Sequence, residues 1–171
     1  SLLALAHRQH YLTIDVPPLR GQITDRNGKE FVTNLKIPSI YGVPRALRDE
    51  ERQELSRQVA KILGLDYKWV LERLSRDKSF VWLKRRVTFE ESDKIRKLEC
   101  PGLGILEEYK RFYPQGPMLA QVLGFSTVDN QGVEGIERSM DNELRGKPGM
   151  RVTQRDAKGR EIKAFEMKSL P

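Results

Sequence analysis

The chain has 171 residues, 38% of them hydrophobic, and carries a formal net charge of +7 at pH 7. A chain of this length and composition can bury a real core, so it forms one domain or two small ones and is not a disordered tail. The basic excess permits binding to nucleic acid, anionic lipid or an acidic polymer. However, basic residues are interleaved with acidic ones, and the one dense basic run, Lys84-Arg85-Arg86, lacks repeated aromatic residues for stacking bases. We therefore predict no nucleic-acid binding.

We interpret the N-terminal segment 1–12 as juxtamembrane. Its apolar run, residues 2–6, is far shorter than the roughly 20 residues that cross a bilayer, so we expect the chain itself to be soluble. The segment fits the outer end of a membrane helix that has been cut away, and it fits an ordinary amphipathic start equally well. Cys100 is the only cysteine and forms no internal disulfide, while His7 and His10 lack a third metal ligand. We predict no metal and no cofactor.

Two stretches have the pattern of β-hairpins. In "RGQITDRNGKEFVTN", strand-type residues flank a turn at 25–28, where Asn and Gly tolerate positive φ and Asp bonds its own backbone. In "RVTQRDAKGREIKAF", Asp156 and Gly159 repeat the arrangement of Asp25 and Gly28. Because the flanking residues share little else, this repetition indicates one turn type used twice rather than a duplication.

The region between the hairpins has helical periodicity. Asp49 is predicted to cap a helix that runs to Leu63 and stops at Gly64, and Asp66 to cap a second helix ending near residue 74. "FVWLKRRV" is typical of a strand, and Thr88 with Glu91 predicts a capping box for a third helix. Residues 45–99 are therefore predicted to be a small inserted αα-β-α head subdomain.

The remaining chain returns to sheet-forming patterns. "GILEEYKRFY" predicts a strand, and a short helix "MLAQVLG" follows the turn "YPQGP". A long helix is predicted over "QGVEGIERSMDNELRG", with Val133, Ile136, Met140 and Leu144 on one face. The fold class is α+β: a pedestal of antiparallel β-hairpins at 13–44 and 100–171, the inserted head subdomain at 45–99, and the long helix packed on the sheet.

Three motifs together carry a family resemblance. They are "RGQITDRNG" at 20–28, "RFYPQG" with "AQVLGF" at 111–125, and "GVEGIERSMDNELRGKPG" at 132–149. In this order they resemble the non-catalytic N-terminal module of class B penicillin-binding proteins, the peptidoglycan D,D-transpeptidases, across roughly residues 14–168. The connector "GFSTVDNQGVEGIE" has no insertion, which resembles the septal, cell-division branch more than the elongation branch. The elongation type stays the alternative.

The resemblance implies what surrounds and contacts this module. It implies a membrane anchor before the module in the full-length protein, a transpeptidase domain after it, and a place on the periplasmic face of the cytoplasmic membrane. Its implied partners are its own transpeptidase domain, a SEDS-family glycan polymerase, other divisome proteins and a second copy as a homodimer. Rival interpretations are enzyme activity within this chain and a basic module that binds anionic wall polymer.

"SRDK" at 75–78 has the Ser-x-x-Lys spacing of a penicillin-binding nucleophile. A catalytic Ser-x-x-Lys needs a buried helix start, an oxyanion hole and two further motifs opposite it. No Lys-Thr-Gly or Lys-Ser-Gly occurs in the chain. We therefore predict that Ser75 is not a nucleophile and that this chain has no catalytic residue.

The resemblance implies a structural role for the candidate site residues, which belong to the motifs: Arg20, Gly21, Asp25, Arg26, Gly28, Arg111, Pro114, Gly116, Gly132, Gly135, Glu137 and Gly146. Bidentate pairs between arginine and carboxylate can fix separate strands and a helix at set geometry. We expect Glu137 to accept from an arginine of the first hairpin segment or from Arg111. The alternative is that these charges are solvated and each contribute about 0–1 kcal/mol.

Four aromatic residues concentrate in the head subdomain, and most of their area is expected in its core: Trp69, Phe80, Trp82 and Phe89. The functional alternative is a docking surface for another division protein. Because aromatic residues and arginine are enriched at interface hot spots, its candidate residues are Trp82, Lys84, Arg85 and Arg86.

Overall fold

The computed structural model describes the backbone of residues 10–155 and 161–167, and side chains between residues 12 and 150. This part of the chain divides into two compact units. Unit 1 contains residues 10–14, Ile37–Glu107, 151–155 and 161–166. Unit 2 contains chiefly Asp15–Lys36 and Glu108–Met150. The predicted α+β class is confirmed, since helices are combined with antiparallel strand pairs.

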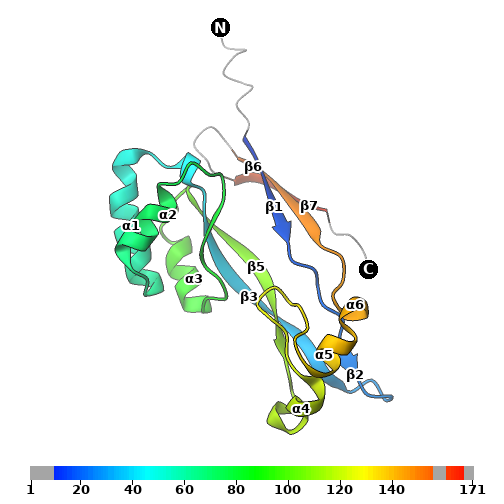
Figure 1. Cartoon of the computed structure of the whole chain (residues 1–171). Helices are drawn as coiled ribbons and strands as arrows, with labels where there is room; N and C mark the ends of the chain where they lie inside the picture. Colours follow the sequence, from blue (N-terminus) through cyan, green and yellow to red (C-terminus); the bar gives the residue numbers. More distant parts are fainter. Residues whose placement is uncertain (1–9, 156–160, 168–171) are drawn as a thin grey trace. The chain divides into compact units, whose positions relative to one another are not determined.

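Three helices and one strand of unit 1 follow the predicted order. They are α1 (Asp49–Leu63), α2 (Tyr67–Leu74), strand β4 (Val81–Lys84) and α3 (Phe89–Arg96). Figure 1 shows the three helices grouped together beside the strands of this unit. The order αα-β-α expected for this stretch is therefore present.

The ends of these helices are set by local side chains. The Asp66 carboxylate accepts from the Trp69 backbone N–H at 2.9 Å, and Thr88 with Glu91 forms the predicted capping box. Gly64 ends α1 with φ +64°. One cap differs from the prediction: Asp49 is the first residue of α1, and Arg48 precedes it without a side-chain cap. Asp49 still lies in the first turn of α1, where a negative charge interacts favourably with the helix dipole.

Apolar side chains fill the interior of unit 1. The main cluster joins α1, α2, β4 and α3 to the end of β3, and its buried members are Ile40, Leu47, Leu55, Val59, Ala60, Leu63, Val70, Leu74, Val81, Leu83, Val87 and Ile95. A smaller cluster contains Leu12, Ile14, Tyr41, Val43 and Leu106. The interior of unit 1 is thus a conventional hydrophobic core.

Two strands contribute residues to both units. Strand β3 (Glu30–Gly42) pairs with β2 (Ile23–Thr24) in unit 2 and with β4 in unit 1, where Tyr41 faces Trp82. Strand β5 (Leu103–Phe112) also pairs with β3. The predicted strand over "GILEEYKRFY" is therefore confirmed.

The first predicted hairpin is present. The Asp25 carboxylate accepts from the backbone N–H groups of Asn27 and Lys29, both at 2.8 Å, and Gly28 has φ +81°. A second sheet has the order β1-β6-β7, so the strands of the second predicted hairpin, β6 (Gly149–Arg155) and β7 (Glu161–Met167), are neighbours. Its turn residues Asp156 and Gly159 lie outside the described residues.

Strand β1 (His10–Val16) was not predicted. It begins inside the segment 1–12 that the sequence assigned as juxtamembrane, and residues 1–9 lie outside the described residues. Within the described residues, no helix has the length and apolar character needed to span a bilayer.

The predicted long helix at 131–146 is wrong. The structure has two short helices there, α5 (Gly135–Ser139) and α6 (Asp141–Leu144), with non-helical angles at Met140. In a continuous helix the Glu137 carbonyl would accept from the Asp141 N–H, but it accepts from Arg20 Nη2 at 2.6 Å. Met140 is 44% exposed, so the apolar residues do not form one buried stripe.

Candidate functional site

Arg20 is the centre of a buried ion network in unit 2. Its side chain is fully buried, and Nε donates to Glu137 Oε2 at 2.6 Å. Nη1 donates to Asp141 Oδ1 at 2.6 Å and to the Asn130 carbonyl at 2.9 Å. With Nη2 bound to the Glu137 carbonyl, every nitrogen of the guanidinium has a partner. Such a fully paired arginine fixes geometry in a way that lysine cannot.

Arg111, on β5, reaches the same carboxylate from a second element. Its Nε donates to Glu137 Oε1 at 2.7 Å, and its Nη1 donates to the Gly21 carbonyl at 2.7 Å and to Asn34 Oδ1 at 3.1 Å. The structure thus brings Glu137 together with both arginines, where the hypothesis required only one.

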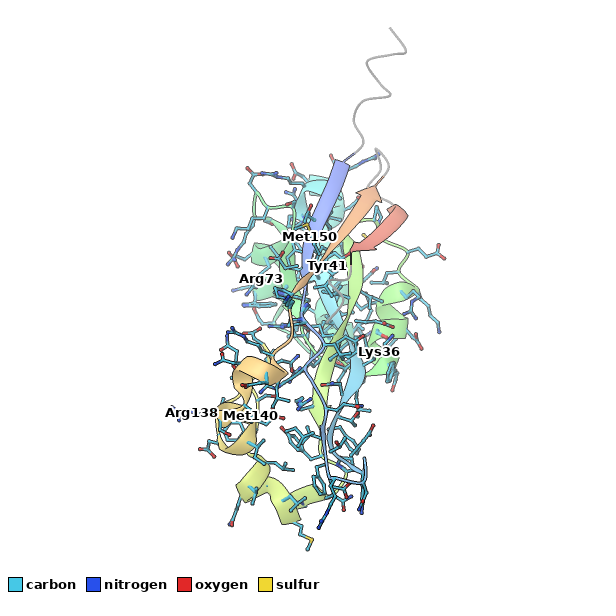
Figure 2. The ribbon with its side chains drawn as sticks, turned by 90° about the vertical axis from the view of Figure 1, so that its right-hand side faces the viewer. Lys36, Tyr41, Arg73, Arg138, Met140 and Met150 are labelled. Carbon is cyan, nitrogen blue, oxygen red and sulfur yellow. The ribbon has the colours of Figure 1, made fainter. Side chains whose placement is uncertain are left out.

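Glu137 accepts two charged hydrogen bonds while its side chain is fully buried. Two guanidinium groups and the carboxylates of Glu137 and Asp141 balance in charge, which offsets part of the cost of burying them. The next residue, Arg138, points outward, as Figure 2 shows. Charge-assisted bonds of this kind are the strong ones in proteins.

The network shifts the pKa values of two groups that are hydrogen-bonded within it. The Gly132 N–H, which donates to Asp141 Oδ1 at 2.8 Å, and then Arg20 lower the pKa of Asp141 below its ordinary value of 3.8. Burial, and then the negative charge of Glu137, raises the pKa of Tyr113. The Tyr113 hydroxyl lies 3.4 Å from Glu137 Oε1 and donates to it. The site therefore favours an ionised Asp141 and a neutral Tyr113.

Besides Tyr113, three polar residues of the network were not among the predicted site residues. Asn34 Nδ2 donates to the Arg20 carbonyl at 2.6 Å, and Asn130 Nδ2 donates to the Tyr109 carbonyl at 3.2 Å. Asp141 bridges Arg20 and Gly132. Asp141 lies within the third motif, so the motif pointed to it, whereas no local pattern marks Asn34. Asn130 has φ +58°, which asparagine tolerates better than most residues.

Two predicted glycines are required by close backbone approach. A Cβ at Gly132 would overlap the Glu137 carbonyl oxygen. Gly135 has φ +61°, and a Cβ there would lie 2.5 Å from the Val122 carbonyl oxygen. Gly21 donates its N–H to the Leu144 carbonyl at 2.7 Å, and Gly146 has φ +65° after α6. These four glycines allow the segments around the network to pack closely.

The other motif residues lie in turns and do not join the network. Asp25 and Gly28 shape the β2–β3 turn, and Arg26 is exposed on it. Pro114 is exposed in the turn after β5, where the Gly116 N–H donates to the Tyr113 carbonyl at 2.9 Å. The first motif therefore contributes Arg20 and Gly21 to the network, and its later residues to a turn.

The candidate docking residues are partly committed to unit 1 itself. Lys84 Nζ donates to the Leu63 carbonyl at 2.8 Å and to Glu91 Oε1 at 2.7 Å. Trp82 packs edge-on against Phe80, with ring centres 5.0 Å apart, and Arg85 lies over its ring at 5.0 Å. The backbone N–H of Arg86 donates to Ser39 Oγ, and Arg86 has φ +55°. The four residues therefore contribute to the packing of unit 1 and also form part of its surface.

The other two aromatic residues of the head subdomain, Phe89 and Trp69, do not lie in its core as expected. Phe89 is 70% exposed, and Trp69 is 38% exposed with Arg73 over its ring at 4.6 Å. Both lie on helix faces turned away from the clusters of unit 1, so only Phe80 and Trp82 pack against the interior.

Ser75 caps the C-terminal end of α2 and is exposed. Its Oγ donates to the Leu71 carbonyl at 2.7 Å. A catalytic serine donates instead to a base. Asp77, between Ser75 and Lys78, pairs with Arg45 at 3.0 Å. This geometry is that of a helix end.

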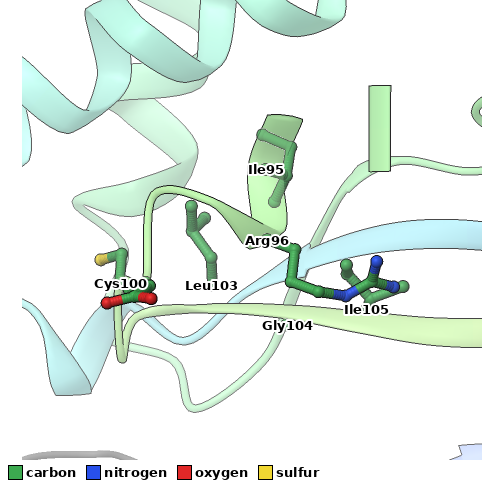
Figure 3. A pocket seen from close by; sticks show the side chains of 7 residues that line it. Ile95, Arg96, Cys100, Leu103, Gly104 and Ile105 are labelled. Carbon is green, nitrogen blue, oxygen red and sulfur yellow. The ribbon is translucent and has the colours of Figure 1, made fainter. Parts of the chain in front are cut away.

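A pocket of about 250 Å³ lies in unit 1 between α3 and β5. Figure 3 shows Ile95, Leu103 and Ile105 around it, with the Arg96 side chain extended along it. Cys100 lines one end, and burial raises the pKa of its thiol, which therefore stays protonated. Among the described residues, no three metal-ligating side chains gather at one place.

Comparison with known proteins identifies the family. A family model described as "Penicillin-binding Protein dimerisation domain" matches residues 15–169. The chain is 34% identical over 148 residues to the peptidoglycan D,D-transpeptidase FtsI of Escherichia coli, which covers 84% of this chain and 25% of that protein. It is 32% identical over 165 residues to the stage V sporulation protein D of Bacillus subtilis, covering 95% of this chain and 25% of that one.

Solved structures share the fold. PBP2 of Helicobacter pylori, in complex with MreC, matches with a TM-score of 0.61 and 21% identity over 93% of this chain and 34% of that chain. Penicillin Binding Protein 2X of Streptococcus thermophilus matches with a TM-score of 0.57 and 19% identity over 92% and 28%. By class, the fold is an α+β module that penicillin-binding proteins contain.

The chain belongs to the penicillin-binding protein dimerisation domain family. It spans about a quarter of the length of the curated relatives named above.

Proposed function

We propose that this chain is the non-catalytic pedestal of a class B penicillin-binding protein and that it positions a transpeptidase domain for peptidoglycan cross-linking. The relatives named D,D-transpeptidases support this role. The observation that carries it is the double pairing of Glu137 with Arg20 and Arg111. This pairing holds separate segments of unit 2 together, and a module that supports a catalytic domain has to keep its shape.

The proposed location is the periplasmic face of the cytoplasmic membrane, with a membrane anchor in the full-length protein. The proposed partners are the transpeptidase domain itself, a SEDS-family polymerase and other divisome proteins. The Helicobacter pylori PBP2 that shares this fold was solved in complex with MreC, which supports partner binding as part of the role.

We favour the septal branch over the elongation branch. The uninterrupted connector "GFSTVDNQGVEGIE" and the 34% identity to FtsI support it. A fluorescent fusion of the full-length protein tests the choice. Accumulation at midcell and filamentation on depletion would support the septal role, whereas lateral-wall localisation and rounded cells would favour elongation.

The pedestal role itself is tested by Glu137→Ala in the full-length protein, with the exposed neighbour Glu134→Ala as the matched control. We expect labelled penicillin to acylate the variant normally, because the reactive serine lies in another domain, while cross-linking in cells falls sharply. Normal cross-linking by a Glu137→Ala protein would contradict the role.

The non-catalytic assignment has a separate test. The isolated chain, treated with a labelled β-lactam, is expected to form no covalent adduct. An adduct that disappears in Ser75→Ala would show that the exposed hydroxyl is a nucleophile after all and would overturn the assignment.

Trp82, Lys84, Arg85 and Arg86 stay a proposed docking surface. What supports it is the half-buried Trp82 ring with Arg85 above it, a combination common at interface hot spots. Lys84 is the weakest member, because its amine already has two partners within unit 1.

A further inference from the structure

The turn between β2 and β3 is the part of the first motif that does not join the ion network, and it carries the dipeptide Asn27-Gly28. Both residues are exposed, and a Cβ added at Gly28 would meet no atom within 4 Å, so the space beside its backbone is open. Among the described residues, none forms a hydrogen bond with the Asn27 side-chain amide. Asparagine is chemically labile when exposed and followed by glycine, because glycine has no Cβ to block the approach to its nitrogen.

The reaction open to this dipeptide is deamidation, which needs no enzyme and no reactant other than water. The Gly28 nitrogen loses its proton and attacks Asn27 Cγ. The side-chain amide group leaves as ammonia, taking up that proton, and a succinimide ring remains. Water then opens the ring at either of its carbonyl carbons. Opening at Cγ gives aspartate, and opening at the main-chain carbonyl gives isoaspartate, in which the chain runs through the side-chain carbon.

The folded turn restrains this reaction. The Gly28 N–H donates to the Asp25 carbonyl at 3.0 Å, which holds the nitrogen in place and shields its proton from base. The Asp25 carboxylate fixes the turn by accepting from the backbone N–H groups of Asn27 and Lys29, both at 2.8 Å. However, β2 is only two residues long and its register with β3 is irregular, so few bonds have to break before the turn opens.

We propose that Asn27 is a deamidation site and that the Asp25 carboxylate, by keeping the turn closed, controls how fast it reacts. Either product places a new carboxylate beside Asp25, and isoaspartate also lengthens the main chain. The modified hairpin therefore cannot rebuild the same turn. The proposed pedestal role does not depend on this inference, and each can fail while the other stands.

The other asparagines of the chain lack the combination found at Asn27. The side-chain amides of Asn34 and Asn130 are hydrogen-bonded within the ion network. Asn142 is exposed, but it lies in α6 and is followed by glutamate, whose side chain hinders attack by its backbone nitrogen. These three residues are therefore internal references for the reaction at Asn27.

The test is a long incubation of the 171-residue chain in mildly alkaline water enriched in heavy oxygen. Mass spectrometry of proteolytic peptides locates the heavy oxygen, and an isoaspartate-specific methyltransferase detects isoaspartate. We expect both signals at Asn27 and neither at the other asparagines, and we expect the folded chain to react more slowly than a synthetic peptide of residues 20–34. Asp25→Ala should raise the rate in the chain about fivefold or more, because two hydrogen bonds that close the turn are lost.

The matched control is Glu30→Gln, which removes the same charge beside the turn, leaves the bonds of Asp25 in place and should react like the wild type. Asn27→Gln should abolish the signal, because the longer side chain closes a ring far more slowly. An unmodified Asn27, or a rate that Asp25→Ala raises no more than Glu30→Gln does, would overturn the proposal. So would a folded wild-type chain that reacts as fast as the peptide, a comparison that still holds if Asp25→Ala fails to fold.

Discussion

The two units of this protein are stabilised in opposite ways. The buried side chains of unit 1 are almost all apolar, in two clusters that include Val59, Val70 and Leu74. The largest buried side chains of unit 2 include Arg20 and Glu137, with Arg111 beside them, and its buried apolar residues are few, among them Val32 and Leu123. Unit 2 also exposes more large apolar side chains, such as Leu19, Met118 and Val122, than unit 1 does.

The difference shows how short segments without a core can be held in place. Hydrophobic burial is non-directional and tolerates small shifts, whereas a paired arginine is satisfied in only one arrangement. A buried ion network adds little net stability relative to an apolar core, but losing one member is costly. We infer that unit 2 gains a defined geometry from its network rather than a large free energy of unfolding.

Removing the shared carboxylate is expected to have the largest effect. Glu137→Ala leaves Arg20 and Arg111 buried without their partner, so we expect unit 2 to lose about 3–5 kcal/mol of stability. Hydrogen exchange should show lost protection within 108–150 while unit 1 keeps its protection. Glu134→Ala, an exposed position three residues earlier, is the control. Equal protection in both variants would mean that the network does not support unit 2.

The reverse experiment targets the core of unit 1. Leu74→Ala removes a fully buried side chain between the helices, and we expect a loss of about 2–5 kcal/mol. Trp69 and Trp82 both lie in unit 1, so tryptophan fluorescence follows this unit during denaturant unfolding. Leu71→Ala, at a half-buried position on the same helix, should cost less. A Leu74→Ala transition at the wild-type midpoint would contradict the contrast between the units.

Sequence reasoning succeeded where local rules decide the structure. Asp66, the Thr88–Glu91 box and Gly64 mark helix ends through bonds within one turn, so α2 and α3 and the end of α1 were predictable. The pairing of Glu137 was expected from the motifs. The break at Met140 was not predictable, because it depends on Arg20 binding the Glu137 carbonyl from a position more than a hundred residues away in the chain. Asn34 was missed for the same reason.

Trp82→Ala separates the core role of this residue from docking. Trp82 packs against Phe80 and is half-buried, so we expect unit 1 to lose about 1–3 kcal/mol yet to stay folded. A pull-down of divisome proteins with the folded variant then measures docking, with Trp69→Ala, an exposed tryptophan outside the patch, as the control. Undiminished partner binding by folded Trp82→Ala, or complete unfolding of unit 1, would contradict the proposed docking role.

The smallest expected effect concerns acid and belongs to unit 2. The folded state lowers the pKa of Asp141, so folding favours its ionised form. This contribution is fully present above the ordinary value of 3.8 and is lost as the pH falls through the lowered pKa. Asp141→Asn keeps an oxygen for the Gly132 N–H and for Arg20 but cannot titrate. We expect a modest loss at neutral pH and, below the ordinary value, a shallower fall of stability with acid than in the wild type. Hydrogen exchange of 108–150 at a series of pH values measures this, and parallel acid profiles for the two proteins would show that another carboxylate controls the acid sensitivity of unit 2.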